Sequence, residues 1–308
     1  MAATLIVNPR ASRVTPERTS AVARELERAG PLEVVETGAR WHARDLAADA
    51  SARGDTVYVF SGDGGFNEAL NGLGEVPIGF LPGGATSVLP RALGLSRDPV
   101  ACARAFAANP RTRRISLGRV NGRRFAFASG IGLDASAVRR VEERGRRQDG
   151  SRRGDLAFIG AFASLLREAG GRIEAHAQVV GHGRAAWVLV SNCTIYTFAG
   201  RVPLRVAPAA RFELGLDLVA PASVSLRSVP RFLRYGLTGR GQERARDLIY
   251  LHDADRIEVR SDSPLPLQAD GEDLGDAERV VFEAERDAVS VLVAGATARS
   301  RLRGRCPR

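Results

Sequence analysis

The sequence contains no lysine, and all 45 of its Lys and Arg positions are arginine. A Walker A loop needs a lysine on the nucleotide phosphates and Schiff-base enzymes need an amine, so both classes are excluded. Cysteine is scarce as well. Cys102, Cys193 and Cys306 lie far apart without C-x-x-C spacing, which indicates neither a disulfide framework nor a zinc site. We therefore expect a protein of the reducing cytoplasm.

Aromatic residues make up only 6% of the chain, and the arginines are spread along it, which disfavours a nucleic-acid binder. The sequence contains no G-x-S-x-G segment, and its histidines lack metal-ligand spacing, so neither a hydrolase nor a metalloenzyme of that kind is indicated.

Long apolar runs are also missing. The longest, Leu156–Leu166, is too short to span a bilayer, and the start of the chain lacks the pattern of a signal peptide. The chain is rich in arginine and alanine and has a formal charge of +10, for which there are two explanations. One is a base bias of the genome, and the other is functional. The functional one is attraction to anionic lipid headgroups, about 1 kcal/mol per well-placed basic residue. Any membrane contact is therefore expected to be peripheral, at the inner face of the membrane.

The first third of the chain alternates short β-branched runs with helical patterns, a βαβ rhythm that predicts a parallel, doubly wound sheet. The first helix has clear start and stop signals: Thr15 is placed to cap it, Pro16 is at its first position, and Gly30 is just past its end. The predicted strands are Thr4–Val7, Leu32–Glu36, Thr56–Phe60 and Pro77–Leu81, and the predicted helices include Pro16–Ala29 and His42–Ala52.

Beyond about Arg113 the pattern changes to shorter alternating segments, which predict a mostly antiparallel second domain. We expect a first domain at residues 1–115, a second at 116–290 whose last strands return to the first, and a basic, disordered tail at 297–308. The predicted strands of the second domain are Phe125–Ser129, Ile173–Val180, Ala186–Asn192, Ile257–Arg260 and Val280–Glu283. The charged stretch Arg139–Arg153 is expected to be a helix end or a loop.

A glycine-rich segment, Ser61–Glu68, follows the third predicted strand. Gly62, Gly64 and Gly65 let the main chain approach phosphate oxygens closely, and the N-terminus of the following helix adds about half a positive charge. Asp63 is unusual there, because a carboxylate in a phosphate site needs a bridging cation, for which Mg²⁺ is expected. An ordinary acidic turn between strand and helix is the alternative for this segment alone.

A second loop, Pro82–Ser87, repeats the arrangement after the next strand, with Thr86 or Ser87 expected to cap a helix that tolerates Pro90 in its first turn. The ends of neighbouring parallel strands meet at one edge of a sheet. Both loops are therefore expected to open into the same crevice.

Here the sequence resembles the diacylglycerol kinase and sphingosine kinase family, including its bacterial lipid kinases. The resemblance rests on SGDGGFNEALNGL from Ser61, PIGFLPGGATSVLPRALGL from Pro77, and shorter matches along almost the whole chain. These are Asn8-Pro9, Thr37 with His42-Ala43, SGIGLDA at Ser129–Ala135, the segment Asn192–Pro208, and the Asp-Gly-Glu motif at Asp270–Glu272. The resemblance implies an α/β N-terminal domain of phosphofructokinase-like (NAD kinase and diacylglycerol kinase) type and a β-sandwich-like C-terminal domain. It also implies transfer of the ATP γ-phosphoryl group to a lipid hydroxyl, at a site between the two domains.

The resemblance also assigns roles to residues. Asp270 or Glu272 is expected to be the catalytic base, with Asp63 as a further catalytic group, and Asp63 and Asp134 are expected to organise Mg²⁺ and water. A solvated acidic turn is the alternative for the Asp270 segment. The residues expected to contact ATP are Asn8, Pro9, Thr37, Gly62, Asp63, Gly64, Gly65, Asn67, Glu68, Gly83, Gly84 and Thr86.

The chain departs from the family pattern at three places. Gly65 stands where the family usually has a threonine, which removes a hydroxyl that could contact phosphate, and Ser87-Val88 replaces Asn-Asp. The Asp-Asp-Gly metal turn is represented by Glu213 and Asp217, so a structural magnesium site there is a weaker expectation.

We expect an ATP- and Mg²⁺-dependent kinase acting on a lipid with a free hydroxyl, diacylglycerol or a sphingoid base, on an anionic membrane surface. An NAD kinase and a catalytically impaired nucleotide or lipid sensor are the alternatives, no nucleic-acid partner is expected, and a homodimer is left open.

Overall fold

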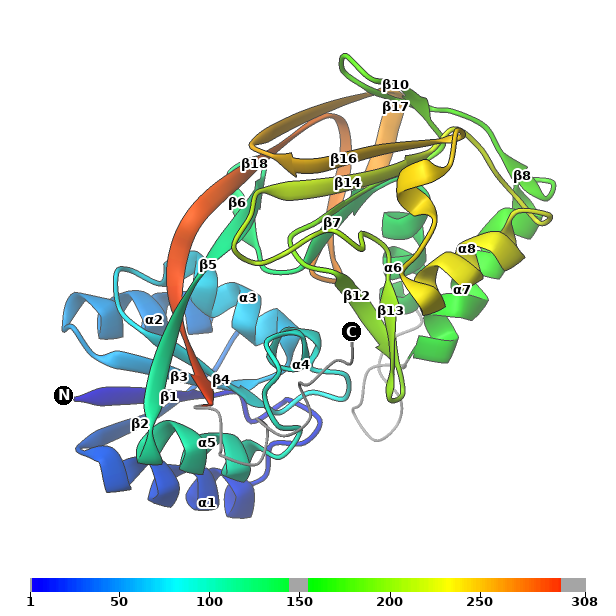
Figure 1. Cartoon of the computed structure of the whole chain (residues 1–308). Coiled ribbons are helices and arrows are strands. Elements are labelled where there is room, and N and C mark those ends of the chain that lie inside the picture. Colours follow the sequence, from blue (N-terminus) through cyan, green and yellow to red (C-terminus); the bar gives the residue numbers. More distant parts are fainter. Residues whose placement is uncertain (1, 144–154, 295–308) are drawn as a thin grey trace, which may run out of the picture.

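The computed structural model describes residues 2–143 and 155–294, with the side chains of 155–159 left aside. It contains an α/β region and a strand-rich region, joined by one large sheet (Figure 1). Within these residues no helix has both the length and the apolarity needed to cross a bilayer. The predicted basic tail, Cys306 and most of the charged stretch after Arg139 lie outside the described residues.

The α/β region has a parallel sheet in the order β4-β3-β1-β2. α1 packs beside α5, and α2 packs beside α3 (Figure 1). The elements are β1 (Ala3–Val7), α1 (Pro16–Leu26) with the 3-10 turn η1 (Glu27–Ala29), β2 (Leu32–Glu36), α2 (His42–Ala52), β3 (Thr56–Ser61), α3 (Asp63–Gly72), β4 (Ile78–Pro82), α4 (Val88–Ala92) and α5 (Pro99–Ala108). The predicted bounds are confirmed to within one residue for these strands and for α2. The predicted first helix ends as a 3-10 turn.

The start of α1 is built as its sequence predicts. The Thr15 hydroxyl accepts a hydrogen bond from the Arg18 amide at 3.3 Å, and Pro16 occupies the first helical position. Such a cap satisfies one of the amides that a helix N-terminus leaves without a partner.

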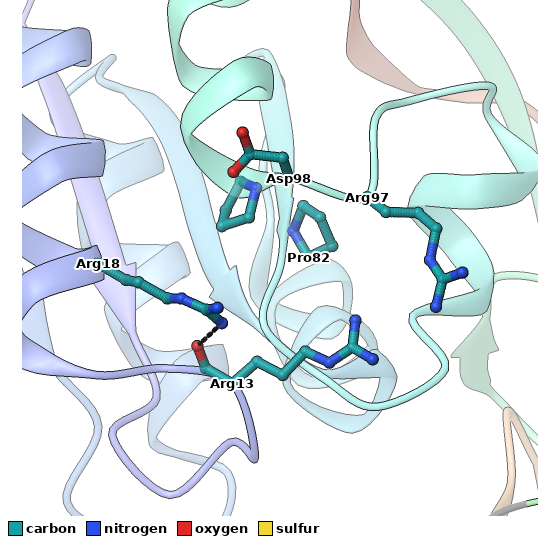
Figure 2. A pocket seen from close by; sticks show the side chains of 6 residues that line it. Arg13, Arg18, Pro82, Arg97 and Asp98 are labelled. Carbon is teal, nitrogen blue, oxygen red and sulfur yellow. Dashed lines mark hydrogen bonds between the residues drawn. The ribbon is translucent and has the colours of Figure 1, made fainter.

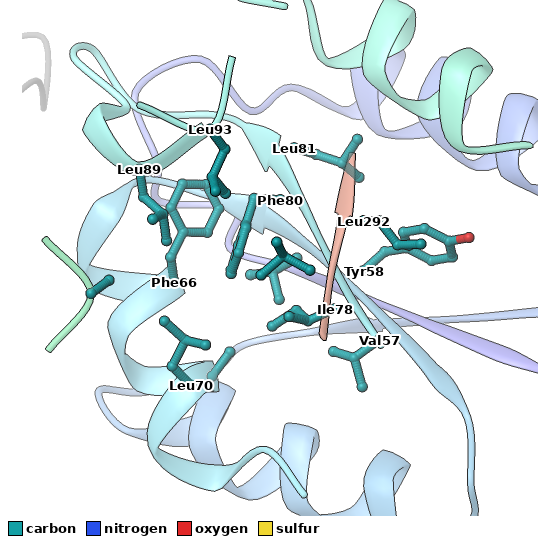
Figure 3. Packing of buried hydrophobic residues seen from close by; sticks show 14 of the residues in the cluster. Val57, Tyr58, Phe66, Leu70, Ile78, Phe80, Leu81, Leu89, Leu93 and Leu292 are labelled. Carbon is teal, nitrogen blue, oxygen red and sulfur yellow. The ribbon is translucent and has the colours of Figure 1, made fainter. Parts of the chain in front are cut away.

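The core of the α/β region lies between β3, β4 and α3 (Figure 3). Phe66 and Leu70, spaced four residues apart on α3, are fully buried, and Phe66 meets Phe80 of β4 edge-on at 5.2 Å between ring centroids. Leu292, from the far end of the chain, packs against the same sheet. This packing fixes the direction in which α3 leaves the first glycine loop.

The strand-rich region is an antiparallel sheet in the order β16-β14-β11-β7-β17-β18. Its strands are β5 (Pro110–Val120), β6 (Arg123–Phe125), β7 (Ala128–Ile131), β8 (Arg172–Ile173), β9 (Ala177–Val179), β10 (Gly183–Ala185), β11 (Val188–Ser191), β12 (Ile195–Ala199), β13 (Val202–Arg205), β14 (Leu216–Pro221), β15 (Val224–Ser225), β16 (Leu248–Ala254), β17 (Arg256–Ala269) and β18 (Glu272–Ala294). Its helices are α6 (Leu133–Glu143), α7 (Asp155–Glu168), α8 (Val229–Thr238) and the 3-10 turn η2 (Gln242–Arg244). The fold class predicted from the sequence, an α/β region followed by a strand-rich region, is confirmed.

Two strands predicted as continuous are interrupted. The segment Phe125–Ser129 divides into β6 and β7 because the amides of Ala126 and Phe127 donate to a side-chain carboxylate, that of Asp270, instead of to a neighbouring strand. The segment Ile173–Val180 likewise divides, into β8 and β9.

β5 and β18 connect the two regions. β18 pairs antiparallel with β17 through its first half, antiparallel with β5 from Phe282 to Ala294, and parallel with β4 at Val291 and Ile78. The boundary predicted at residue 115 therefore falls inside a strand, β5, that runs through both regions (Figure 1).

Candidate active site

The two glycine loops lie directly against each other. β3 and β4 are hydrogen-bonded neighbours in register from Val57 and Ile78 to Ser61 and Pro82, so their carboxyl ends meet, as predicted. A Cβ atom on Gly84 would lie 2.8 Å from the Cα atom of Gly62, closer than real Cβ contacts occur. Glycine is therefore required where the two main chains touch.

The first loop ends at the N-terminus of α3. The amides of Gly64 and Gly65 have no acceptor among the residues that the structure describes, and the helix N-terminus carries a partial positive charge. Close main-chain approach and free amides make this a suitable site for phosphate oxygens. The residues of the loop thus fit the predicted nucleotide phosphates.

Asp63 joins the two loops. Its two carboxylate oxygens accept hydrogen bonds from the amides of Val88 at 2.9 Å and Leu89 at 3.0 Å, at the start of α4. Ser87 occupies the N-cap position of this helix, as predicted, but its hydroxyl makes no hydrogen bond to the helix and instead accepts one from the Gly84 amide at 3.2 Å. Asp63 therefore fixes the second loop, in addition to any contact with a cation.

The Ser61 side chain occupies the space that a side chain at position 65 would need. A Cβ atom on Gly65 would lie 2.1 Å from the Ser61 hydroxyl oxygen and 2.8 Å from its Cβ atom. The same hydroxyl accepts from the Asn8 side-chain amide at 3.2 Å, and Ser61 borders the cavity described below. The Ser61 hydroxyl, four residues earlier in the chain, therefore lies close to where a side chain at position 65 would be.

Asp270 lies in the tight turn between β17 and β18, with a left-handed backbone (φ 50°). Its buried carboxylate accepts hydrogen bonds from the amides of Ala126, Phe127 and Ala128 and, at 2.8 Å, from the Asn67 side chain of α3. Burial raises the pKa of Asp270 to about 6, although these donors act to lower it. The carboxylate is thereby held firmly beside the helix that follows the first glycine loop.

Glu272 contacts the first glycine loop itself. A Cβ atom on Gly64 would lie 3.0 Å from a Glu272 carboxylate oxygen. The buried carboxylate forms an ion pair with Arg123, and the guanidinium of Arg40 lies 3.8 Å away. These two guanidinium groups hold the Glu272 carboxylate against the first glycine loop.

Asp134, at the start of α6, is the second buried acid of the site. Its carboxylate accepts from the Tyr196 hydroxyl and, at 2.7 Å, from the Gln268 side chain. Burial raises the pKa of Asp134 to about 6, and it raises that of Tyr196 as well. Asp134 and Asp270 are thus both poised to titrate near neutral pH.

One cavity of about 870 Å³ brings these groups together. Asn8, Gly62, Asp63, Gly64, Gly65, Gly84, Thr86, Asp134 and Asp270 border it at one end. The remainder of its wall is largely apolar and comes from α6, α7, β11, β14 and α8. Figure 1 shows α6, α7 and α8 grouped together beside the strand-rich sheet. A polar end at the glycine loops and a long apolar end form one continuous space.

Several predicted residues do not border this cavity. Asn67 and Gly83 lie just behind it, with Asn67 holding Asp270 and Gly83 packed against Val14, where a Cβ atom would lie 2.7 Å from that side chain. The Glu68 carboxylate receives hydrogen bonds from the backbone at the start of α2, while burial raises its pKa. Pro9 and Thr37 are not among the lining residues either.

The weaker metal expectation at Glu213 and Asp217 gains no support. Glu213 pairs with Arg113, and the buried Asp217 accepts from Tyr250 at 2.8 Å and contacts His252. Over residues 2–143 and 155–294, no three acidic, histidine or cysteine side chains form a metal-binding group. A cation at the glycine loops would therefore be held partly by the phosphate oxygens of the bound nucleotide.

A smaller cavity of about 440 Å³ lies beside Pro82, at the start of the second glycine loop (Figure 2). Arg13, Arg18 and Arg97 line it, together with Asp98, which caps α5. Arg18 donates to the Arg13 carbonyl at 3.0 Å. These guanidinium groups add positive charge at the sheet edge that carries the loops, which favours an anionic ligand there.

Four contributors to the site were not predicted from the sequence: Ser61, Arg123, Tyr196 and Gln268. Two of them carried a local signal, because Ser61 stands directly before the glycines and Gln268 stands two residues before Asp270. Arg123 and Tyr196 lie far from these segments in the sequence, and the fold brings them to the site.

Comparisons with known proteins agree with this geometry. Residues 2–120 match the model of the diacylglycerol kinase catalytic domain. A diacylglycerol kinase of Bacillus subtilis (strain 168) is 32% identical over 137 residues, which is 42% of this chain and 45% of that protein, so the match spans less than half of the relative's length.

Solved structures extend the likeness to the whole chain. The crystal structure of a diacylglycerol kinase from Bacillus anthracis strain Sterne superposes with a TM-score of 0.70 over 94% of this chain and 96% of that one, at 18% sequence identity. At that identity the likeness establishes the fold.

Proposed function

Because residues 2–120 match the model of the diacylglycerol kinase catalytic domain, we propose that this chain is an ATP-dependent lipid kinase. It transfers the γ-phosphoryl group of ATP to a hydroxyl of a lipid such as diacylglycerol or a sphingoid base. The observation that carries the proposal is the single cavity that runs from the glycine loops, past Asp270, into a space with largely apolar walls.

The nucleotide end of the site is supported by the two loops. The amides of Gly64 and Gly65 and the Ser61 hydroxyl would hold phosphate oxygens, with Thr86 on the second loop opposite them. When bound, ATP supplies the phosphoryl group and a divalent cation neutralises its developing charge. Asp63 would hold the cation while keeping the second loop in place.

Asp270 is the residue best placed to accept the proton of the lipid hydroxyl. It borders the cavity, its pKa of about 6 suits a base at neutral pH, and Asn67 ties it to the helix that begins at the first loop. The ion pair of Glu272 with Arg123 makes it a positioning group for the Gly64 main chain. Asp134, further along the cavity, would orient the acceptor through Tyr196 or a water molecule.

The cavity walls favour a lipid over NAD as acceptor. Phe127, Phe162, Trp187, Leu189 and Phe232 offer apolar surface, whereas a dinucleotide requires hydrogen-bonding groups along its length. A sensor without catalytic activity was suggested by the lost hydroxyl at Gly65. The Ser61 hydroxyl beside Gly65 weakens that alternative.

In the direct test, the purified protein is incubated with labelled ATP and Mg²⁺. The acceptor is dispersed diacylglycerol, sphingosine or NAD. We expect label in a lipid and none in NAD, and Asp270→Asn is expected to lower kcat by at least about 100-fold. Glu213→Gln is the matched control, because Glu213 lies outside the cavity, and it should retain activity. Thermal unfolding of both variants checks their fold. Labelled NAD, or no product with any acceptor, would refute the proposal.

A further inference from the structure

Helix α8 and Leu226, which precedes it, carry apolar side chains that face the cavity and apolar side chains that face solvent. Phe232 and Tyr235 face the cavity, and Tyr235 is buried. Leu226, Leu233 and Leu237 are 57%, 50% and 50% exposed. They are three of the six large apolar side chains that stand exposed in the described part of the chain, and they lie within twelve residues of one another. Such a concentration indicates a surface that contacts something apolar.

The exposed leucines form one face. Leu233 and Leu237 are four residues apart on α8 and therefore neighbours on its surface, with Arg234 beside them. Leu226 and Arg227 precede the helix and are exposed as well. We call these five residues, Leu226, Arg227, Leu233, Arg234 and Leu237, the α8 face.

The α8 face stands at the mouth of the cavity. Leu226 and Leu233 are half-exposed to solvent and also line the cavity, so the cavity reaches the surface beside them. An apolar molecule entering there would pass between these leucines.

The segment that carries the α8 face has a net positive charge. Residues 226–247 contain six arginines and two acidic residues, Glu243 and Asp247. Asp247 is paired with Arg231, which leaves Arg227, Arg234 and Arg240 with no ion pair among the described residues. Leucines flanked by arginines are the composition of a helix that lies in the interface of an anionic membrane.

We propose that the α8 face docks on an anionic lipid bilayer, inserting its leucines between the headgroups while the arginines contact lipid phosphates. The cavity mouth then opens onto the membrane, from which the acceptor lipid enters without crossing water. This inference rests on the proposed function and adds to it the surface through which the kinase meets its lipid. It explains why leucines stand exposed where the cavity opens, which the kinase reaction alone does not require.

A second copy of the chain is a poorer occupant of the α8 face. A symmetric contact would bring Arg227 and Arg234 of both copies together, and like charges in a contact of low dielectric constant repel. A bilayer that contains anionic lipids supplies the opposite charge and the apolar depth together.

The test measures binding to sedimenting vesicles without ATP and without diacylglycerol, so that it does not depend on catalysis. The wild-type protein is compared with Arg234→Glu/Leu237→Glu, neither of which lines the cavity. The matched control is Val34→Glu on the outer strand β2, where a 42% exposed valine lies far from α8. We expect the wild type and V34E to bind phosphatidylglycerol-containing vesicles alike, and the double variant to bind at least about tenfold more weakly.

Equal binding by the double variant, an equal loss in V34E, or equal binding to vesicles of phosphatidylcholine alone would overturn the proposal. So would self-association of the wild type, seen in sedimentation velocity and lost in the double variant, if vesicle binding is absent. A second arm supplies a short-chain diacylglycerol dissolved as monomers, on which the double variant should retain the wild-type rate. If the wild type phosphorylates no lipid at all, the proposed function fails, whereas the vesicle measurement still decides the docking.

Discussion

The contact between Ser61 and Gly65 makes a quantitative prediction about stability. Gly65→Ala would place a Cβ atom 2.1 Å from the Ser61 hydroxyl oxygen and 2.8 Å from its Cβ atom. Both Ser61 atoms sit at the base of a buried side chain, so neither can move away as the end of a long side chain would. The variant therefore strains the junction of β3 and α3, even though alanine suits a helix better than glycine.

The magnitude follows from two opposing effects. Overpacking of this kind costs about 1–3 kcal/mol, whereas replacing a helical glycine with alanine contributes about 1 kcal/mol of stability. Gly65→Ala should thus lower the free energy of unfolding by up to about 2 kcal/mol. Ser61→Gly should cost about 1–2 kcal/mol through the lost hydrogen bond from Asn8 and added backbone freedom.

The double variant Ser61→Gly/Gly65→Ala is the informative one. With Ser61 reduced to glycine, the nearest remaining atom to a Cβ at position 65 is the Asn8 side-chain nitrogen, 3.8 Å away, an ordinary contact. The two substitutions should therefore be less harmful together than the sum of the single effects, by about 1–3 kcal/mol. Urea unfolding of the four proteins, combined in a double-mutant cycle, measures this coupling.

Gly160→Ala provides the control, because Gly160 lies in α7 and a Cβ atom there would meet nothing within 4 Å. This variant should have a free energy of unfolding about 1 kcal/mol higher than that of the wild type. Additive effects of Ser61→Gly and Gly65→Ala, within about 0.5 kcal/mol, would refute the reasoning that Ser61 excludes a side chain at position 65.

Four further predictions concern the acids, an amide and the hydroxyl. Because a protonated Asp270 cannot accept the hydroxyl proton, kcat/KM should fall about tenfold per pH unit below about pH 6 and level off above it, and Asp134→Asn should keep this dependence. Asn67→Ala removes a hydrogen bond that lowers the pKa of Asp270, so the midpoint of the same pH profile should move upward; an unchanged or lower midpoint would contradict the role of Asn67. Asp63→Ala removes the acceptor for two α4 amides and should cost about 1–2 kcal/mol in urea unfolding, whereas an unchanged midpoint would exclude the cap. Ser61→Ala should raise KM for ATP, and Ser61→Gly/Gly65→Thr should restore it in part, if the two positions supply one hydroxyl.

The local elements of the α/β region could be predicted because their signals are local. The cap at Thr15, the proline after it and the period of Phe66 and Leu70 depend only on neighbours a few residues away. The glycine loops were likewise visible, since only glycine permits the main-chain contact at Gly62 and Gly84.

The finer arrangement of the site could not be predicted, because it depends on pairings across the fold. Arg123 and Glu272 are 149 residues apart, and Asn67 and Asp270 are 203 apart. The sequence singled out Asn67, Asp270 and Glu272 as site residues, but nothing in their segments shows which partner each side chain meets. Asp63 illustrates the same limit, because its sequence context suggested a cation, whereas the structure also gives it two amide donors from the next loop.

The paired strands β5 and β18 also set how the two regions are joined. Their ladder is interrupted between Glu285 and Val289, where Asp287 takes a left-handed backbone (φ 48°) and its amide reaches the Ser116 hydroxyl at 3.4 Å. A bulge of this kind bends its strand and increases the local twist. The interruption therefore lets one pair of strands belong to both sheets, and it contributes to the angle at which the strand-rich region brings Asp270 to the glycine loops.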